Sequence, residues 1–210
     1  MLTGELKTEN QKQIYWILAF PLILCAAIQA GVTSISDEWL KLAAIEGASG
    51  ALLYGAALVL TNLLPQSLKH KLVFTRLKDE MPAGRIHRLI SKDPRIDFDA
   101  ASTRWPDIFD ESIGQSKRNS LWYSNIYKPV RDSSPVKQAH RTFLLFRDVT
   151  SGLAFLFFTA AIWFALGQTS WIPPLHGATP VVLFVFTVLT LIVARNAGTR
   201  MVVNAVAEAL

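Results

Sequence analysis

The residues best suited to chemistry in this chain are arginines that crowd one turn-rich stretch. Arg85, Arg88 and Arg95 fall within eleven residues, and Arg141 follows about two helical turns before a long apolar segment. The planar guanidinium group presents paired donors that match the oxygens of phosphate and carboxylate. We therefore expect Arg85, Arg88, Arg95 and Arg141 to form one anion-binding surface. The alternative is that these charges serve membrane topology and contact with anionic lipid.

Aromatic side chains accompany these arginines in the sequence. Trp105, Trp122, Tyr123 and Tyr127 follow within the same polar segment. Aromatic faces stack on nucleobases, and arginines bind the phosphates beside them. The composition of this segment therefore suits a nucleotide or another anionic ligand.

Groups that would indicate catalysis are scarce. The four histidines show no metal-ligand spacing with each other or with acids, and neither a Gly-rich phosphate loop nor a nucleophile elbow is present. Cys25 is the single cysteine, which rules out an intramolecular disulfide. Asp93, Asp97 and Asp99 have a spacing that could suit a metal, but Pro94 and Arg95 between them favour a turn with paired charges. We expect no catalytic residue, no metal, no cofactor and no enzymatic activity.

Four apolar segments determine the expected architecture. Residues 14–32 and 149–166 carry no charge, residues 42–64 carry only Glu46, and residues 179–194 end just before Arg195. About 20 apolar residues in a helix cross the hydrocarbon core of a bilayer. The sequence therefore predicts a membrane protein dominated by α-helix, with four transmembrane helices and a small cytoplasmic domain between spans two and three.

The distribution of basic residues predicts the orientation of these spans. Sixteen of the 21 Lys and Arg residues lie in residues 65–148, whereas the loops at 33–41 and 167–178 carry one and none. Basic loops stay on the cytoplasmic side. We expect both termini in the cytoplasm, with residues 1–64 forming the N-terminus and spans one and two, 65–147 the cytoplasmic domain, 148–195 spans three and four, and 196–210 a C-terminal helix.

Local signals predict elements within and beside the cytoplasmic domain. Turn residues Pro82, Gly84 and Pro94 favour loop or short strand over residues 85–99, and a helix is expected from 111 to about 127, before Pro129. Ser134 and Pro135 give a capping signal followed by helical propensity up to Gly167. Residues 135–167 are therefore expected to form one long helix that joins the domain to the membrane.

Small and polar residues within the spans suggest helix contacts. Gly47, Ala51 and Gly55 recur every four residues in span two, which permits close approach by another helix, either span one or a second copy of the chain. Glu46 and Gln29 fall at equal depth and could form a hydrogen-bonded pair. Asp148 and Arg195 both lie at the inner boundary, where a helix-tethering ion pair is expected. We expect a homo-oligomer whose interface includes Gly47, Ala51 and Gly55.

A resemblance covers mainly the cytoplasmic segment and the start of span three. Its residues are Leu72, Val73, Phe74, Arg76, Pro82, Arg85, Asp93, Pro94, Arg95, Ile96, Asp97, Leu121, Trp122, Tyr123, Tyr127, Lys128, Ala139, His140, Arg141, Phe143, Leu144, Leu145, Arg147 and Asp148. In this pattern the chain resembles a group of bacterial inner-membrane proteins with four spans, although Ala83 intervenes where Gly is expected directly after Pro82. The resemblance implies a bacterial inner-membrane location and no activity. Small proteins of this build resemble membrane components of antiphage defence systems.

Two classes of function fit these features. The first is a membrane-anchored sensor or effector subunit, whose basic cytoplasmic domain binds a partner protein or an anionic ligand. The second is a small oligomeric channel or transporter. The spans carry few polar groups for a transport pathway, and the cytoplasmic segment is larger than a simple pore needs, which favours the first. The expected partners are membrane lipids, further copies of the chain, a cytoplasmic protein and a nucleotide or other anionic ligand.

The charge asymmetry predicts that residue 118 faces the cytoplasm and residue 171 the outside. Arg118→Cys and Trp171→Cys, each in a Cys25→Ser background, can be treated in intact cells with a membrane-impermeant thiol reagent. We expect labelling at position 171 alone, because the reagent cannot reach the cytoplasm. Labelling at position 118 and not at 171 would overturn the orientation.

Overall fold

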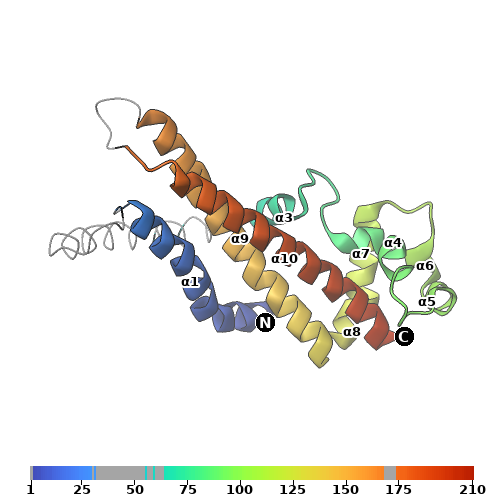
Figure 1. Ribbon diagram of the computed structural model, residues 1–210. Coiled ribbons are helices and arrows are strands. Elements are labelled where there is room, and N and C mark those ends of the chain that lie inside the picture. The colour runs from blue at the N-terminus through green and yellow to red at the C-terminus, as the bar shows by residue number, and fades with distance from the viewer. Residues whose placement is uncertain (1, 30, 32–54, 56–58, 60–63, 168–173) are drawn as a thin grey trace. The chain divides into compact units, whose positions relative to one another are not determined.

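The computed structural model describes residues 2–29, 31, 55, 59, 64–167 and 174–210 of this protein. All regular elements within these residues are helical, and none of them is a strand (Figure 1), which confirms the prediction of an all-helical chain. The described residues fall into two compact units. The first comprises those of Met1–Lys69 and Leu145–Leu191, and the second comprises His70–Leu144 and Ile192–Leu210.

Three helices supply the core of the first unit, as far as the structure describes it. They are α1 (Leu2–Gln29), the C-terminal half of α9 (Ser134–Leu166) and the N-terminal part of α10 (Ala178–Ala209). Leu18, Val149 and Leu153 are fully buried in their shared apolar core. Gln29 links α1 to the segment before α10, because its side chain donates to the Pro174 carbonyl at 3.2 Å and accepts from the His176 amide at 2.8 Å.

Two helices in the part of the chain that the structure describes are long and apolar enough to cross a membrane. They are α9 and α10, whereas α1 contributes a shorter apolar stretch, Gln13–Gln29, at the first predicted span. The second predicted span falls almost entirely outside the described residues, and so do Glu46, Gly47 and Ala51. The long helix predicted over residues 135–167 is confirmed, since α9 runs from Ser134 to Leu166.

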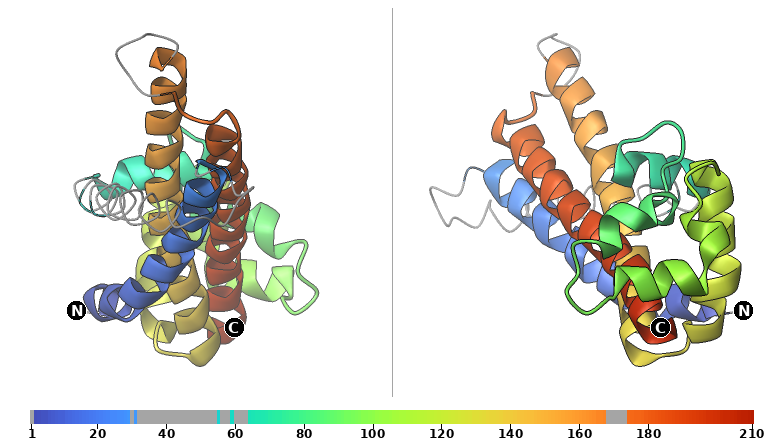
Figure 2. Two further views of the ribbon diagram at one scale, coloured as in Figure 1. Left: turned by 60° about the vertical axis from the view of Figure 1, so that its left-hand side comes forward. Right: turned by 90° about the vertical axis from the view of Figure 1, so that its right-hand side faces the viewer.

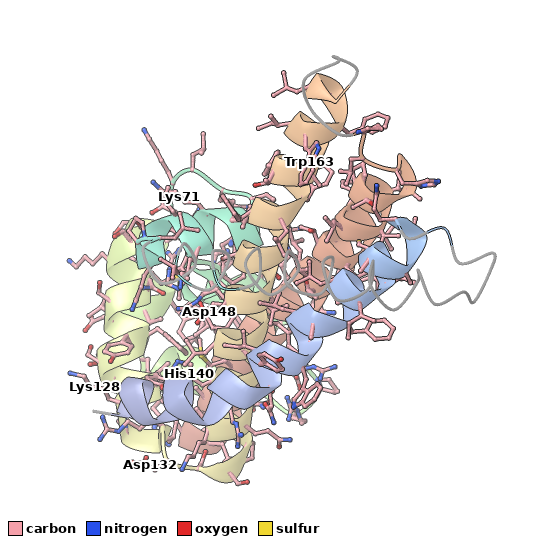
Figure 3. The ribbon with its side chains drawn as sticks, turned by 90° about the vertical axis from the view of Figure 1, so that its left-hand side faces the viewer. Lys71, Lys128, Asp132, His140, Asp148 and Trp163 are labelled. Carbon is pink, nitrogen blue, oxygen red and sulfur yellow. The ribbon has the colours of Figure 1, made fainter. Side chains whose placement is uncertain are left out.

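A buried charge cluster lies where α9 enters the first unit. Oδ1 of Asp148, labelled in Figure 3, accepts from Lys69 Nζ at 3.0 Å and from Arg147 Nε and Nη2 at 3.0 and 2.9 Å. All three side chains are at most 5% exposed. The predicted pair of Asp148 with Arg195 is wrong. Asp148 is already held by two cations, and Arg195 instead donates to the Val73 carbonyl and to Thr75 Oγ1.

Short helices surround the C-terminal part of α10 in the second unit (Figure 2). In chain order they are α3 (Gln66–Phe74), of which residues from His70 belong here, η1 (Pro82–Arg85), α4 (Ile86–Ile90), α5 (Phe98–Arg104), α6 (Pro106–Phe109), α7 (Gln115–Trp122), the π-helical turn η2 (Tyr123–Tyr127) and α8 (Lys128–Val130). Ile86, Ile108 and Ile126 from these helices are fully buried in one core with Val202 and Val206 of α10. The second unit therefore has its own apolar core, to which the last turns of α10 contribute.

Arg118 of α7 holds the connecting segments of this unit together. Its guanidinium donates to the carbonyls of Ile108 at 2.9 Å, Gly84 at 3.2 Å, Asp110 at 2.8 Å and Ile113 at 3.3 Å, and the residue is only 6% exposed. Buried carbonyls need donors, and these segments form no regular ladder that could supply them. One side chain of α7 therefore fixes two other stretches of backbone, at Gly84 and at residues 108–113.

Two sequence predictions for this unit need correction. Residues 85–99 were expected as loop or strand, but α4 and the first turn of α5 are helical there, because Ile86 and Ile90 bury one face of a short helix. The helix expected to stop before Pro129 continues to Val130. The Lys128 amide bonds to the Tyr123 carbonyl, five residues back, and this widened turn accommodates a proline that would distort a regular helix.

Arg118→Ala should destabilise the protein by on the order of 3 kcal/mol, because it leaves buried carbonyls without donors. Thermal or denaturant unfolding of the purified protein measures this. Lys117→Ala, at the exposed neighbouring position, is the matched control and should change stability little. Equal stability of both variants would show that the four hydrogen bonds contribute nothing. Burial also makes position 118 unsuitable for thiol labelling, and Lys117→Cys is the accessible substitute.

Candidate functional site

The second unit contains a pocket of about 400 Å³ that is lined mainly by cations. We call it the basic pocket. Six of its lining residues are basic and one is acidic; the complete lining is Arg76, Arg85, Arg88, Leu89, Lys92, Asp93, Arg95, Thr199, Arg200 and Val203. A pocket of this size is within the range that binds small molecules. Its walls favour an anion.

Local sequence features place these cations around the pocket. Pro82 starts η1 at a position where its missing amide proton is not needed, so that Arg85 ends this turn and Arg88 follows three residues later on α4. Asp97 caps α5 by accepting from the amides of Asp99 at 2.9 Å and Ala100 at 3.2 Å. Lys92 and Arg95 lie in the turn between these two helices. Arg200 comes from the exposed side of α10.

Charge in the basic pocket is largely unneutralised. Arg76, Arg85, Arg88, Lys92 and Arg200 form no side-chain hydrogen bond or ion pair with the described residues. Burial lowers the pKa of Arg85, and the charges of Arg76 and Arg88 lower it further. The Nε atom of Arg85 is buried and has no hydrogen-bond partner among the described residues. A buried donor and repelling neighbours are both conditions that a bound anion would relieve.

Arg95 differs from the other cations because it is already paired. Its Nε donates to Asp93 Oδ1 at 2.9 Å and its Nη2 to Asp93 Oδ2 at 2.8 Å, while the Arg95 amide donates to Asp93 Oδ1 at 3.0 Å. These hydrogen bonds hold the pKa of Asp93 at about 2. Asp93 therefore forms the paired charge that the sequence indicated for this turn, whereas the role of Asp97 as a helix cap is a finding of the structure.

The structure brings together three of the four arginines predicted to form the anion site. Arg85, Arg88 and Arg95 line the basic pocket, whereas Arg141 on α9 is not among its lining residues. Arg76, Lys92 and Arg200 join instead. A sequence signal for Arg200 existed, since it lies five residues beyond Arg195 within the C-terminal helix that the sequence predicts over residues 196–210.

The aromatic residues near these arginines are mostly structural. Trp122 is 2% exposed and Tyr127 is 7% exposed, and both belong to the core of the second unit. Tyr127 Oη is 2.6 Å from His140 Nδ1, and His140 is labelled on α9 in Figure 3. Tyr123, 48% exposed, stacks on Tyr127 with Lys128 over its ring. None of these aromatic residues lines the basic pocket, so they do not supply the stacking surface suggested by the sequence.

Comparisons of the chain with protein-family models, curated proteins and solved structures find no match. What the site can do therefore follows from its geometry. Arginines recognise oxyanions through paired N–H donors, and a cluster of them suits a ligand with several negative oxygens. The described lining offers one carboxylate, already paired with Arg95, and neither Cys nor His as a nucleophile or base. The excess of positive charge in the lining is the property of this pocket that a ligand would meet.

The burial of Tyr127 predicts a pH effect on stability. Burial raises the pKa of Tyr127 from 10.0 to about 12. The folded state thus favours the protonated phenol, so its contribution to stability is complete below pH 10 and is lost as pH rises towards 12. Denaturant unfolding between pH 9 and 12 should show a steeper fall for the parent than for Tyr127→Phe.

Tyr15→Phe, at an exposed tyrosine of the first unit, is the control and should retain the parent's pH dependence. Tyr123→Phe would not serve, because the charge of Tyr123 also raises the pKa of Tyr127. If Tyr127→Phe loses stability between pH 10 and 12 as steeply as the parent, Tyr127 does not contribute to the effect.

Proposed function

We propose that this protein is a membrane-anchored sensor or effector subunit whose second unit binds a phosphate-bearing anionic ligand in the basic pocket. The observation that carries the proposal is the excess of cations, since six basic side chains share the pocket with a single carboxylate. On an ordinary protein surface, basic and acidic side chains are more evenly mixed than in this lining. Repulsion among Arg76, Arg85 and Arg88 costs free energy, and a bound anion would recover it.

Phosphate suits the pocket better than carboxylate does. A phosphoryl group offers three oxygens that several arginines can bind at once, whereas a carboxylate is saturated by one or two. Asp93 already shows how one carboxylate satisfies one arginine, and five cations remain without such a partner among the described residues. The ligand is therefore expected to carry one or more phosphates, either free in solution, as in a nucleotide, or on a lipid headgroup.

The proposed cellular setting is a bacterial inner membrane crossed four times, with both termini and the basic pocket in the cytoplasm. The apolar lengths of α9 and α10 support membrane insertion, and the asymmetry of basic residues supports this orientation. A cytoplasmic partner protein and assembly of several copies complete the proposal. A role in antiphage defence is suggested only by the resemblance in sequence.

A channel or transporter is the alternative, and it gains nothing from the described residues. It depends on packing through Gly47, Ala51 and Gly55, of which Gly55 alone is described, and a side chain added there would meet no other described atom within 4 Å. The basic pocket, by contrast, is formed by described residues of the second unit alone. The binding proposal is thus the better supported one.

Arg85 gives the sharpest test of the pocket. Calorimetric titration of the full chain in detergent with inorganic pyrophosphate should show binding that Arg85→Gln weakens at least tenfold. Arg85→Lys should also weaken binding, because an ammonium group retains the charge but lacks the paired donors. Arg131→Gln removes an exposed arginine outside the pocket and should leave affinity almost unchanged.

Vesicles with and without anionic lipid distinguish the two sources of phosphate. If pyrophosphate fails to bind but anionic vesicles bind in a manner that depends on Arg85, the ligand is a lipid headgroup. If neither probe binds the parent, or if Arg131→Gln weakens binding as much as Arg85→Gln does, the pocket is not an anion site.

A further inference from the structure

Arg95 has fewer free donors than any other arginine of the basic pocket. A guanidinium can bind an oxyanion bidentately through a side fork, Nε with one Nη, or through an end fork, the two Nη atoms. The side fork of Arg95 is filled by Asp93. Its Nη2 atom also donates to Asn204 Oδ1 at 3.1 Å, which uses the remaining Nη2 hydrogen and therefore half of the end fork. Neither fork is available as the structure stands.

Asn204 connects this arginine to the long helix α9. While its Oδ1 accepts from Arg95, its Nδ2 donates to the Pro135 carbonyl at 3.3 Å, in the first turn of α9. Asp93, Arg95, Asn204 and Pro135 thus form a continuous chain of hydrogen bonds from the wall of the basic pocket to the start of a 33-residue helix. All four residues belong to the second unit.

We propose that the contact between Arg95 and Asn204 is a latch, which a bound phosphate opens by taking the end fork of Arg95. This rests on the proposed function, because it requires an anion in the basic pocket. Opening the latch frees the Asn204 amide and loosens its hold on the Pro135 carbonyl. The Asp93 carboxylate occupies the side fork of Arg95 and so competes with the ligand for this arginine. Ligand binding is coupled in this way to the beginning of α9.

If the latch exists, removing the Asn204 side chain should tighten the binding of phosphate. In the parent, the phosphate must break the bond between Arg95 and Asn204, and in Asn204→Ala it need not. Pyrophosphate should therefore bind Asn204→Ala about fivefold more tightly, the factor that corresponds to one ordinary hydrogen bond. Asn196→Ala, on the same helix and outside the basic pocket, is the matched control and should bind as the parent does.

Asp93 provides a second variant. Asp93→Asn should also tighten binding, because it weakens the interaction that competes for Arg95 and removes the one negative charge among the described lining residues. Asp99→Asn removes an equal charge from nearby α5 without touching the lining and should have a smaller effect. A purely structural ion pair between Asp93 and Arg95 would give the opposite result, since its loss would disorder Arg95 and weaken binding.

Hydrogen exchange reports the coupling itself. Pyrophosphate should accelerate amide exchange over residues 136–142 of α9 in the parent, and this response should be absent in Asn204→Ala. If the parent binds pyrophosphate through Arg85 but Asn204→Ala binds no more tightly and exchanges as the parent does, the latch is refuted and the anion site stands. If the parent binds no phosphate on any carrier, both proposals fail.

Discussion

Repulsion among like charges is the constraint that the second unit has to satisfy. Burial lowers the pKa of Arg85, and the nearby charges of Arg76 and Arg88 lower it further. A further cation, the buried Arg118, lies in the same unit. The apolar core and the four carbonyl bonds of Arg118 hold the backbone against this repulsion. The backbone that carries these cations is therefore held in place, whereas exposed side chains such as Arg88 and Lys92 would still have to be ordered by an anion that bound to them.

Features of the fold that arise from long regular patterns could be predicted from the sequence. The bounds of α9 were predicted to within a residue, because Pro135 and an uninterrupted apolar run define a helix by themselves. The short helices of the second unit could not be predicted. Each spans roughly one or two turns, too few for a periodic pattern, and their segments are fixed by Arg118 across as many as 34 residues of sequence.

The basic pocket also contains residues that could be predicted from the sequence and residues that could not. Arg85, Arg88 and Arg95 could be predicted, because residues that are close in the sequence and joined by turns tend to stay close in space. Arg200 comes from another helix, so only the tertiary fold brings it to them. Asp148 shows the same limit, since its partner Lys69 lies 79 residues away in the sequence. One sequence does not specify which of several cations a buried carboxylate selects.

The hydrogen-bond chain from Asp93 to Pro135 also limits how strongly a ligand could act on α9. A ligand shifts a conformational equilibrium only by the difference between its affinities for the two states. One hydrogen bond corresponds to about 1 kcal/mol, or roughly a fivefold change, whereas a shift from 1% to 99% requires about 5.5 kcal/mol. A single latch would therefore bias α9 without switching it fully. If several copies assembled and opened together, their latch energies would add, and the same small contact could then produce a cooperative response.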